Sequence, residues 1–207
     1  LERLSGQPQE TALSDQCLEA ARRLTQEFNS TWNRLEEAAN GIIKEISAAV
    51  GEVDRLTAQL APLNAMIRQE IAQGRSPNNL LDRRDQLVTQ LARLINVDGP
   101  PSDKPGDVMT AGSGTLVIAS GAPGLEVVKT SDGVELQVKG GDVWVSPSGG
   151  KLAGLLASLA DIRQVQGELQ TWFDSLRQSF DHIQATGLGS SGPFSSTTAT
   201  RSVMSST

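Results

Sequence analysis

The sequence predicts a mainly α-helical protein with a small β insert, in which a long antiparallel helical bundle or coiled-coil rod carries a small antiparallel β module. Two observations support this fold class. Apolar residues recur at steps of three and four over one long segment, and again near the end of the chain, which is the spacing of helices that pack on other helices. Between these segments the period changes to two and glycine-rich turns appear, which is typical of short paired strands.

The first predicted helix covers residues 8–73. Its apolar positions form a heptad seam with one stutter, expected between Ile42 and Ile46. The predicted seam positions are Cys17, Ala21, Leu24, Phe28, Thr31, Leu35, Ala38, Ile42, Ile46, Ala49, Val53, Leu56, Leu60, Leu63 and Ile67. At 1.5 Å rise per residue such a helix is roughly 100 Å long. It stays helical in water only if partner helices cover its seam.

Prolines and glycines mark the limits of this helix. Pro8 suits its first turn, and Gly74 closes it. Pro62 lies inside the seam, but the heptads continue through it, so we expect a bend rather than a break. A second helix is predicted over residues 78–95, capped by Ser76 or Asn78. It runs antiparallel to the first because the connection between them is only a few residues long.

The chain is divided into four predicted parts. Residues 1–97 form the helical rod, 98–149 the β module and 150–188 the return helix of the rod, while 189–207 form a flexible tail rich in Ser, Thr and Gly that leads to a further part of the protein. The β module is predicted as an antiparallel meander of four or five short strands. Asp132-Gly133 and Gly140-Gly141 are tight-turn pairs between them.

The composition excludes several classes of protein. The net charge of −6 argues against a nucleic-acid partner, which would need basic stripes. A single cysteine, Cys17, excludes an internal disulfide and a cysteine-based metal cluster. No run approaches the ~20 apolar residues of a membrane helix. His182 is the only histidine and has no ligand-spaced neighbour, so we expect no metal, no cofactor and no catalysis.

Two short motifs carry more information than the composition. Directly after the long helix, the pattern Asn-Leu-Leu-Asp-x-Arg-Asp-x-Leu is matched by Asn79, Leu80, Leu81, Asp82, Arg84, Asp85 and Leu87. At the start of the return helix, the pattern Gly-x-Leu-x-Gly-Leu-Leu is matched by Gly150, Leu152, Gly154, Leu155 and Leu156. Together with the order of the elements over residues 8–187, these motifs resemble the flagellar hook-associated protein 1 family, the hook–filament junction proteins (FlgK).

This resemblance implies a structural component of the bacterial flagellum. Such proteins are exported to the cell exterior through the flagellum's own channel, without a cleaved signal peptide, and form a ring between hook and filament. The implied partners are further copies of the protein, the hook protein and a second junction protein. The chain resembles an internal fragment that lacks both terminal regions. On its own we expect a monomer, because the segments that join subunits would lie outside it.

Alternative interpretations remain open at this point. The first motif is either a charged helix start with local pairing, or a device in which Asn79 caps the helix and Asp82, Arg84 and Asp85 tie the rod to the β module. Trp32 and Trp172 are either interface anchors or packing between helices. For the whole protein, the rival hypothesis is the coiled-coil stalk of an adhesin or sensor with a β insert. An enzyme fits least, for lack of a convergent polar site.

Overall fold

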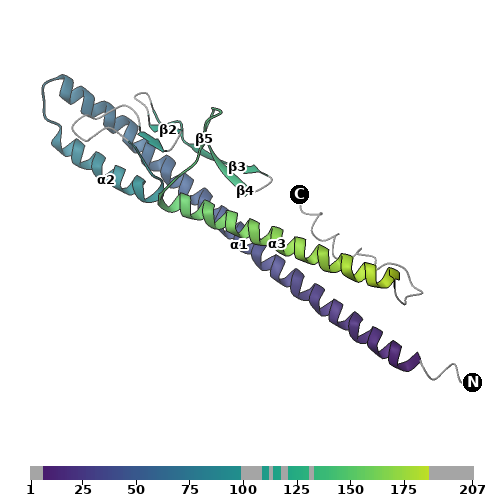
Figure 1. The fold of residues 1–207 in the computed structure, drawn as a ribbon. Coiled ribbons are helices and arrows are strands. Elements are labelled where there is room, and N and C mark those ends of the chain that lie inside the picture. The colour runs from purple at the N-terminus through teal and green to yellow at the C-terminus, as the bar shows by residue number, and fades with distance from the viewer. Residues whose placement is uncertain (1–6, 99–108, 112–113, 118–120, 131–132, 187–207) are drawn as a thin grey trace, which may run out of the picture. The chain divides into compact units, whose positions relative to one another are not determined.

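A computed structural model describes residues 7–98, 109–111, 114–117, 121–130 and 133–186 (Figure 1). In this described part, helices α1 and α2 precede strands β1 to β5, and helix α3 follows them. The predicted class, mainly helical with a small antiparallel β insert, is confirmed. The chain forms two compact units, residues 39–163 and residues 1–38 with 164–207. The domain boundaries predicted at residues 97 and 149 stay predictions, and the predicted tail lies outside the described residues.

Helix α1 spans Gln7–Ala72 and continues through Pro62 without a break. Pro62 is exposed, so its ring displaces no core side chain. The second half of the predicted seam is buried throughout: Ile46, Ala49, Val53, Leu56, Leu60, Leu63 and Ile67. Five of these residues have no exposed surface at all, as expected for a seam covered by other elements of the 39–163 unit.

Two positions in the first half of the seam lie one residue further along than predicted. Thr31 and Ala38 are exposed, whereas Trp32 is half-buried and Ala39 is fully buried. The covered positions then follow one another at alternating steps of four and three from Phe28 to Ile46.

 The continuous series is therefore Phe28, Trp32, Leu35, Ala39, Ile42 and Ile46. The predicted stutter is wrong, because an indole buries far more apolar area than a threonine side chain and so turns this face of the helix inward.

Helix α2 spans Asn78–Leu94 and follows a glycine turn at the end of α1. Gly74 has a φ of +73°, which a residue with a side chain rarely adopts. Its N–H donates to the carbonyl of Ile71, and the N–H of Arg75 donates to the carbonyl of Glu70. These two bonds satisfy carbonyls that the last turn of α1 would otherwise leave without a donor. The turn lets α2 run back alongside α1 (Figure 1).

The start of α2 differs from the prediction. Pro77 occupies the cap position, and no side chain accepts a hydrogen bond from the first amides. The amides of Leu80 and Leu81 donate instead to the carbonyl of Pro77. The predicted caps, Ser76 and Asn78, are therefore wrong. A proline fits here because its fixed φ suits the start of a helix and its missing N–H would have had no partner within the helix.

The strands form two antiparallel sheets rather than one meander. The pairs are β1 (Met109–Ala111) with β2 (Gly114–Val117), and β3 (Leu125–Thr130) with β4 (Gly133–Val138) and then β5 (Trp144–Val145). Between β2 and β3, Gly121 and Gly124 adopt positive φ and Pro123 lacks an N–H. Such residues do not continue a strand ladder, which explains the separation of the two sheets.

The inner face of the strands joins the helical core of the 39–163 unit. The buried strand residues are Leu116, Leu125, Val134, Leu136 and Val145. In β4 the predicted alternation is confirmed, because Glu135 is exposed between two buried neighbours. The predicted tight turn at Gly140-Gly141 is also present, with the N–H of Gly141 donating to the carbonyl of Val138.

Helix α3 spans Gly150–Thr186 and contributes to both units. In the 39–163 unit, its residues Leu152 and Leu159 are buried in the core. In the other unit, the ring of Phe173 stacks on Phe28 with centroids 4.2 Å apart. Of the two tryptophans with open roles, Trp32 is half-buried and stacks on Phe28, whereas Trp172 is 52% exposed.

The buried seam predicts a large effect of a charge at its centre. Leu56→Asp places a carboxylate at a fully buried position without a partner, so we expect a loss of about 3 kcal/mol or more in the free energy of unfolding. Urea unfolding followed by circular dichroism measures it. The matched control is Gln59→Asp, on the exposed face of the same turn. Equal unfolding midpoints for the two variants would contradict the seam.

Candidate functional site

The first matched motif divides between two faces of α2. The inward face carries leucines and one charged residue: Leu80, Leu81, Arg84 and Leu87. The outward face carries the polar residues Asn79, Asp82 and Asp85, all exposed. Helical spacing of three and four therefore places Arg84 inside the leucine stripe. Its guanidinium side chain is only 3% exposed, which is unusual for a residue that normally keeps its charge in water.

Arg84 is held there by a residue of α1 that lies 20 positions earlier in the chain. Its Nε donates to Oδ1 of the fully buried Asn64 at 3.2 Å, and its Nη1 lies 3.5 Å from Oδ1 of Asp85. Asp85 is half exposed, so water screens this ion pair. The Nδ2 atom of Asn64 is buried and has no acceptor within the described part of the chain. The bond joins the two helices in one geometry, because both partners are held in the core.

This geometry changes the interpretation of the motif. The sequence allowed a device that ties the rod to the β module, with Asn79 as cap. Asn79 makes no capping bond, and the hydrogen bond of Arg84 runs to α1 rather than to a strand. Neither acidic residue of the motif lies in the first turn of α2. Arg84 therefore joins α2 to α1, and the part played by the two aspartates stays a prediction.

The tie between helix and strands lies instead at Asp54 of α1, which sequence reasoning missed. Its Oδ1 accepts the backbone N–H of Leu125 at 2.7 Å, and its Oδ2 accepts a bond from Nζ of Lys139 at 2.5 Å. Gly124 allows this approach, because a Cβ there would lie 3.2 Å from the carboxylate oxygens and its φ is +81°. No local pattern marks Asp54, since an aspartate on the polar face of a helix is usually solvated.

The second motif closes the connection between α2 and α3. Gly150 has a φ of +78°, and a Cβ at this residue would lie 2.6 Å from the backbone of both Leu94 and Ile95. Only glycine permits this approach of the two helices. Leu152 is fully buried and Leu155 is half-buried, as expected for the inward face of α3.

Gly154, by contrast, lies on the exposed side of α3. A Cβ there would meet nothing within 4 Å. The motif glycines therefore differ: the close approach of backbone requires the first one, whereas nothing in the structure explains the second.

Two hydrogen bonds of Asn96 hold the same junction between α2 and α3 together. The N–H of Asn96 donates to the carbonyl of Gly149 at 3.2 Å, and Oδ1 of Asn96 accepts the N–H of Ser148 at 2.9 Å. Asn96 thus satisfies backbone groups just after α2 and just before α3. It keeps the end of one helix beside the start of the other, across more than 50 residues of intervening chain.

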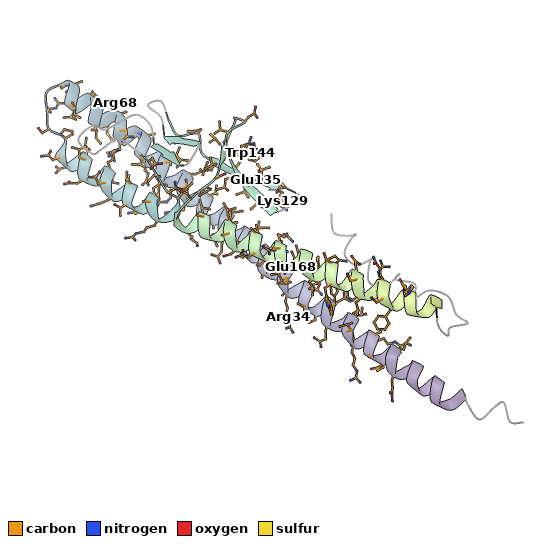
Figure 2. All side chains as sticks on the ribbon, viewed as in Figure 1. Arg34, Arg68, Lys129, Glu135, Trp144 and Glu168 are labelled. Carbon is orange, nitrogen blue, oxygen red and sulfur yellow. The ribbon has the colours of Figure 1, made fainter. Side chains whose placement is uncertain are left out.

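A groove of about 530 Å³ lies between the three-stranded sheet and α3. Its lining is mostly apolar, and Glu135 of β4 is the one charged residue in it; Glu135 and Trp144 are labelled in Figure 2. Among the described residues, no group of three or more His, Cys, Asp and Glu could hold a metal ion. None of the described helices is both long enough and apolar enough to span a membrane. The contacts described above hold elements together.

Two surface ion pairs perturb the titration of carboxylates on α1. A bidentate bond from Arg75 lowers the pKa of Glu70, and Arg55 lowers the pKa of Glu52 in the same way. A depressed carboxyl pKa adds stability above the unfolded-state pKa, and this contribution is lost as the pH falls through the folded-state pKa. Both pairs lie at the surface, so each contributes little.

The role of the buried arginine can be measured against its exposed neighbour. Arg84→Ala leaves a cavity and removes the partner of the buried Asn64 carbonyl, so we expect a loss of about 2–4 kcal/mol in the free energy of unfolding. Arg83→Ala, at an exposed position of the same helix, should change it by less than about 0.5 kcal/mol. Urea unfolding of both variants measures the two changes in the free energy of unfolding. Similar midpoints would show that the motif arginine has no structural role.

The two motif glycines predict opposite effects of the same substitution. Gly150→Ala forces a Cβ into the backbone of α2 at a positive φ, so we expect a loss of about 2 kcal/mol or more. Gly154→Ala adds a methyl group in open space within a helix, which should raise stability by about 0.5–1 kcal/mol. The melting temperatures of the two variants distinguish these effects. An unchanged melting temperature in Gly150→Ala would contradict the close approach of the two backbones.

Comparison with known proteins shows the family of this chain. Residues 1–197 match the family model described as the flagellar hook-associated protein FlgK helical domain. Flagellar hook-associated protein 1 of Escherichia coli (strain K12) is 33% identical over 111 residues, which is 52% of this chain and 20% of that protein. The protein of the same name from Salmonella typhimurium (strain LT2) is 30% identical over 134 residues, which is 63% of this chain and 24% of that protein.

A solved structure shows the same fold. The flagellar hook junction protein FlgK from Burkholderia pseudomallei matches with a TM-score of 0.54 at 24% identity, over 66% of this chain and 27% of that chain. The matched region thus amounts to between a fifth and about a quarter of the length of these relatives. Because the family model covers nearly the whole sequence, the chain belongs to the FlgK helical-domain family of flagellar hook-associated proteins.

Proposed function

We propose that this chain is a structural part of the bacterial flagellum, within a protein that forms the junction between hook and filament. The observation that carries the proposal is the match of residues 1–197 to the FlgK helical domain. Catalysis forms no part of this role. The geometry is consistent with it, because the motif residues Arg84 and Gly150 serve to join helices.

The partners follow from this role. In the full-length protein they are further copies of itself in a ring, the hook protein and a second junction protein. Neither nucleic acid nor a membrane is a partner, and the net charge of −6 disfavours nucleic acid. The protein is extracellular, and is exported through the flagellum without a cleaved signal peptide. The 207-residue chain alone is a monomer, because elements of the same chain already cover the second half of its long seam.

Genetic replacement in the source bacterium tests the role. Deleting the gene for the full-length protein should leave hooks without filaments and abolish swimming, because the filament would lose its attachment. The wild-type gene should restore both, as seen by electron microscopy and by spreading in soft agar. Gold-labelled antibodies against residues 1–207 should mark the hook–filament boundary.

Two variants link this test to the structure. The full-length protein with Arg84→Ala should restore fewer filaments, most clearly at raised temperature, because the contact between α1 and α2 is lost. The protein with Arg83→Ala should act as wild type. Normal filaments in the deletion strain would contradict the proposal. Antibody labelling spread over the cell surface would favour an adhesin or sensor stalk instead.

A further inference from the structure

The edge of β4 that faces β5 is only partly covered. The N–H of Val138 donates to the carbonyl of Val143, just before β5. Every second residue of an antiparallel strand turns its N–H and C=O to the same neighbour, so Leu136 and Val134 face this edge too. β5 pairs with Leu136 but ends before it reaches Val134. Continued register would place Pro147 opposite Val134, and a proline has no N–H to donate.

The uncovered part of this edge borders the groove of about 530 Å³ between the sheet and α3. Val134 lines the groove and is only 7% exposed. In the described part of the chain no strand pairs with it on this side, although buried backbone N–H and C=O groups are nearly always paired. An extended segment in the groove would supply the acceptor and the donor that β5 does not.

The opposite wall of the groove is the start of α3, and its residues are small. Ala153, Ala157 and Ala160 follow one another at steps of four and three, so they share one face of the helix. Ala157 and Ala160 are exposed. Methyl side chains form an apolar wall and leave room for another backbone to approach. The groove therefore has a strand edge on one side and a low apolar surface on the other.

A carboxylate and an indole stand together at the groove. Glu135 and Trp144, both labelled in Figure 2, line it. Trp144 lies opposite Gln137, two residues after Glu135, so the two side chains are diagonal neighbours on one face of the sheet. Among the described residues no cation pairs with the exposed Glu135, and Trp144 is 44% exposed. An aromatic ring beside a carboxylate suits the stem and the charge of a lysine or arginine.

We propose that this groove binds an extended peptide segment of another protein, in which a lysine or arginine lies between small apolar residues. The segment runs along the uncovered edge of β4 and exchanges backbone hydrogen bonds with Val134. Its basic side chain passes over Trp144 to the carboxylate of Glu135, and an apolar side chain faces the alanines of α3. Addition of a strand to an open sheet edge is a general mode of peptide recognition, in which the backbone gives affinity and the side chains give specificity.

Titration of the 207-residue chain with a synthetic peptide, observed by heteronuclear NMR, tests the proposal. The probe is a capped hexapeptide of alternating valine and lysine. The backbone amide of Val134 and the indole N–H of Trp144 should shift and saturate, with a Kd of about 1 mM or below. The same hexapeptide with N-methylated valines keeps its charge but cannot donate along one edge, so it should bind about tenfold more weakly.

Two variants of equal net charge separate the proposed contact from general attraction. Glu135→Gln should weaken binding of the valine–lysine peptide about two- to fivefold, as expected for an exposed ion pair. Glu126→Gln is the matched control, because Glu126 is an exposed carboxylate on the neighbouring strand β3 and does not line the groove. It should leave the Kd unchanged.

Four results would overturn the proposal. The first is the absence of shifts at Val134 and Trp144 when the peptide is at several times the expected Kd. The second is equal weakening by the two glutamine variants, which would show attraction to net charge alone. The third is equal binding of the N-methylated peptide. The fourth is a set of the same shifts on raising the concentration of the chain without peptide, because the groove would then hold a second copy.

Discussion

The apolar seam of α1 is the constraint on which the rest of the structure depends. A helix of 66 residues gains most of its stability from packing its apolar face, and not from its own backbone bonds. Between Ile46 and Ile67 every seam position is buried, so other elements must lie along it. Helix α2, the strands and the first turns of α3 all contribute residues to that core. Each connection between them serves to bring an apolar surface back to α1.

Apolar burial explains why these elements pack, but polar contacts decide where they sit. Within the core of the 39–163 unit, the bond between Asn64 and Arg84 joins α1 to α2, and the carboxylate of Asp54 joins α1 to the sheet. Burial of a guanidinium group is costly, and an aliphatic pair would often be as stable. A bond between such groups tolerates one geometry only, which favours a single arrangement of the helices.

These features suit a scaffold better than a reaction centre. Four polar residues with buried or constrained positions, Asn64, Arg84, Asp54 and Asn96, each join one element to another. The groove beside the sheet is lined mostly by apolar residues, and Glu135 is the single charged residue in its lining. Family membership agrees with this, since the matched relatives are named as flagellar hook-associated proteins.

Sequence periodicity by itself determined the class of the fold and the extent of its helices. The heptads gave α1 to within one residue at each end, because Gly74 and Pro8 flank a pattern that only a helix can bury on one face. The resemblance of two short motifs also identified the family. Such signals lie within one short segment, or in the order of residue types along the chain. They can be recognised without knowing how the helices and strands pack on one another.

Tertiary structure alone decided the partners of individual side chains. The choice of Trp32 and Ala39 over Thr31 and Ala38 depends on which face of α1 is covered. The role of Asp54 depends on strands more than 70 residues away. The spacing of side chains along the chain indicates which face of a helix or strand each one occupies. Which residues contact that face depends on the packing of the whole core, so no single segment of the sequence predicts them.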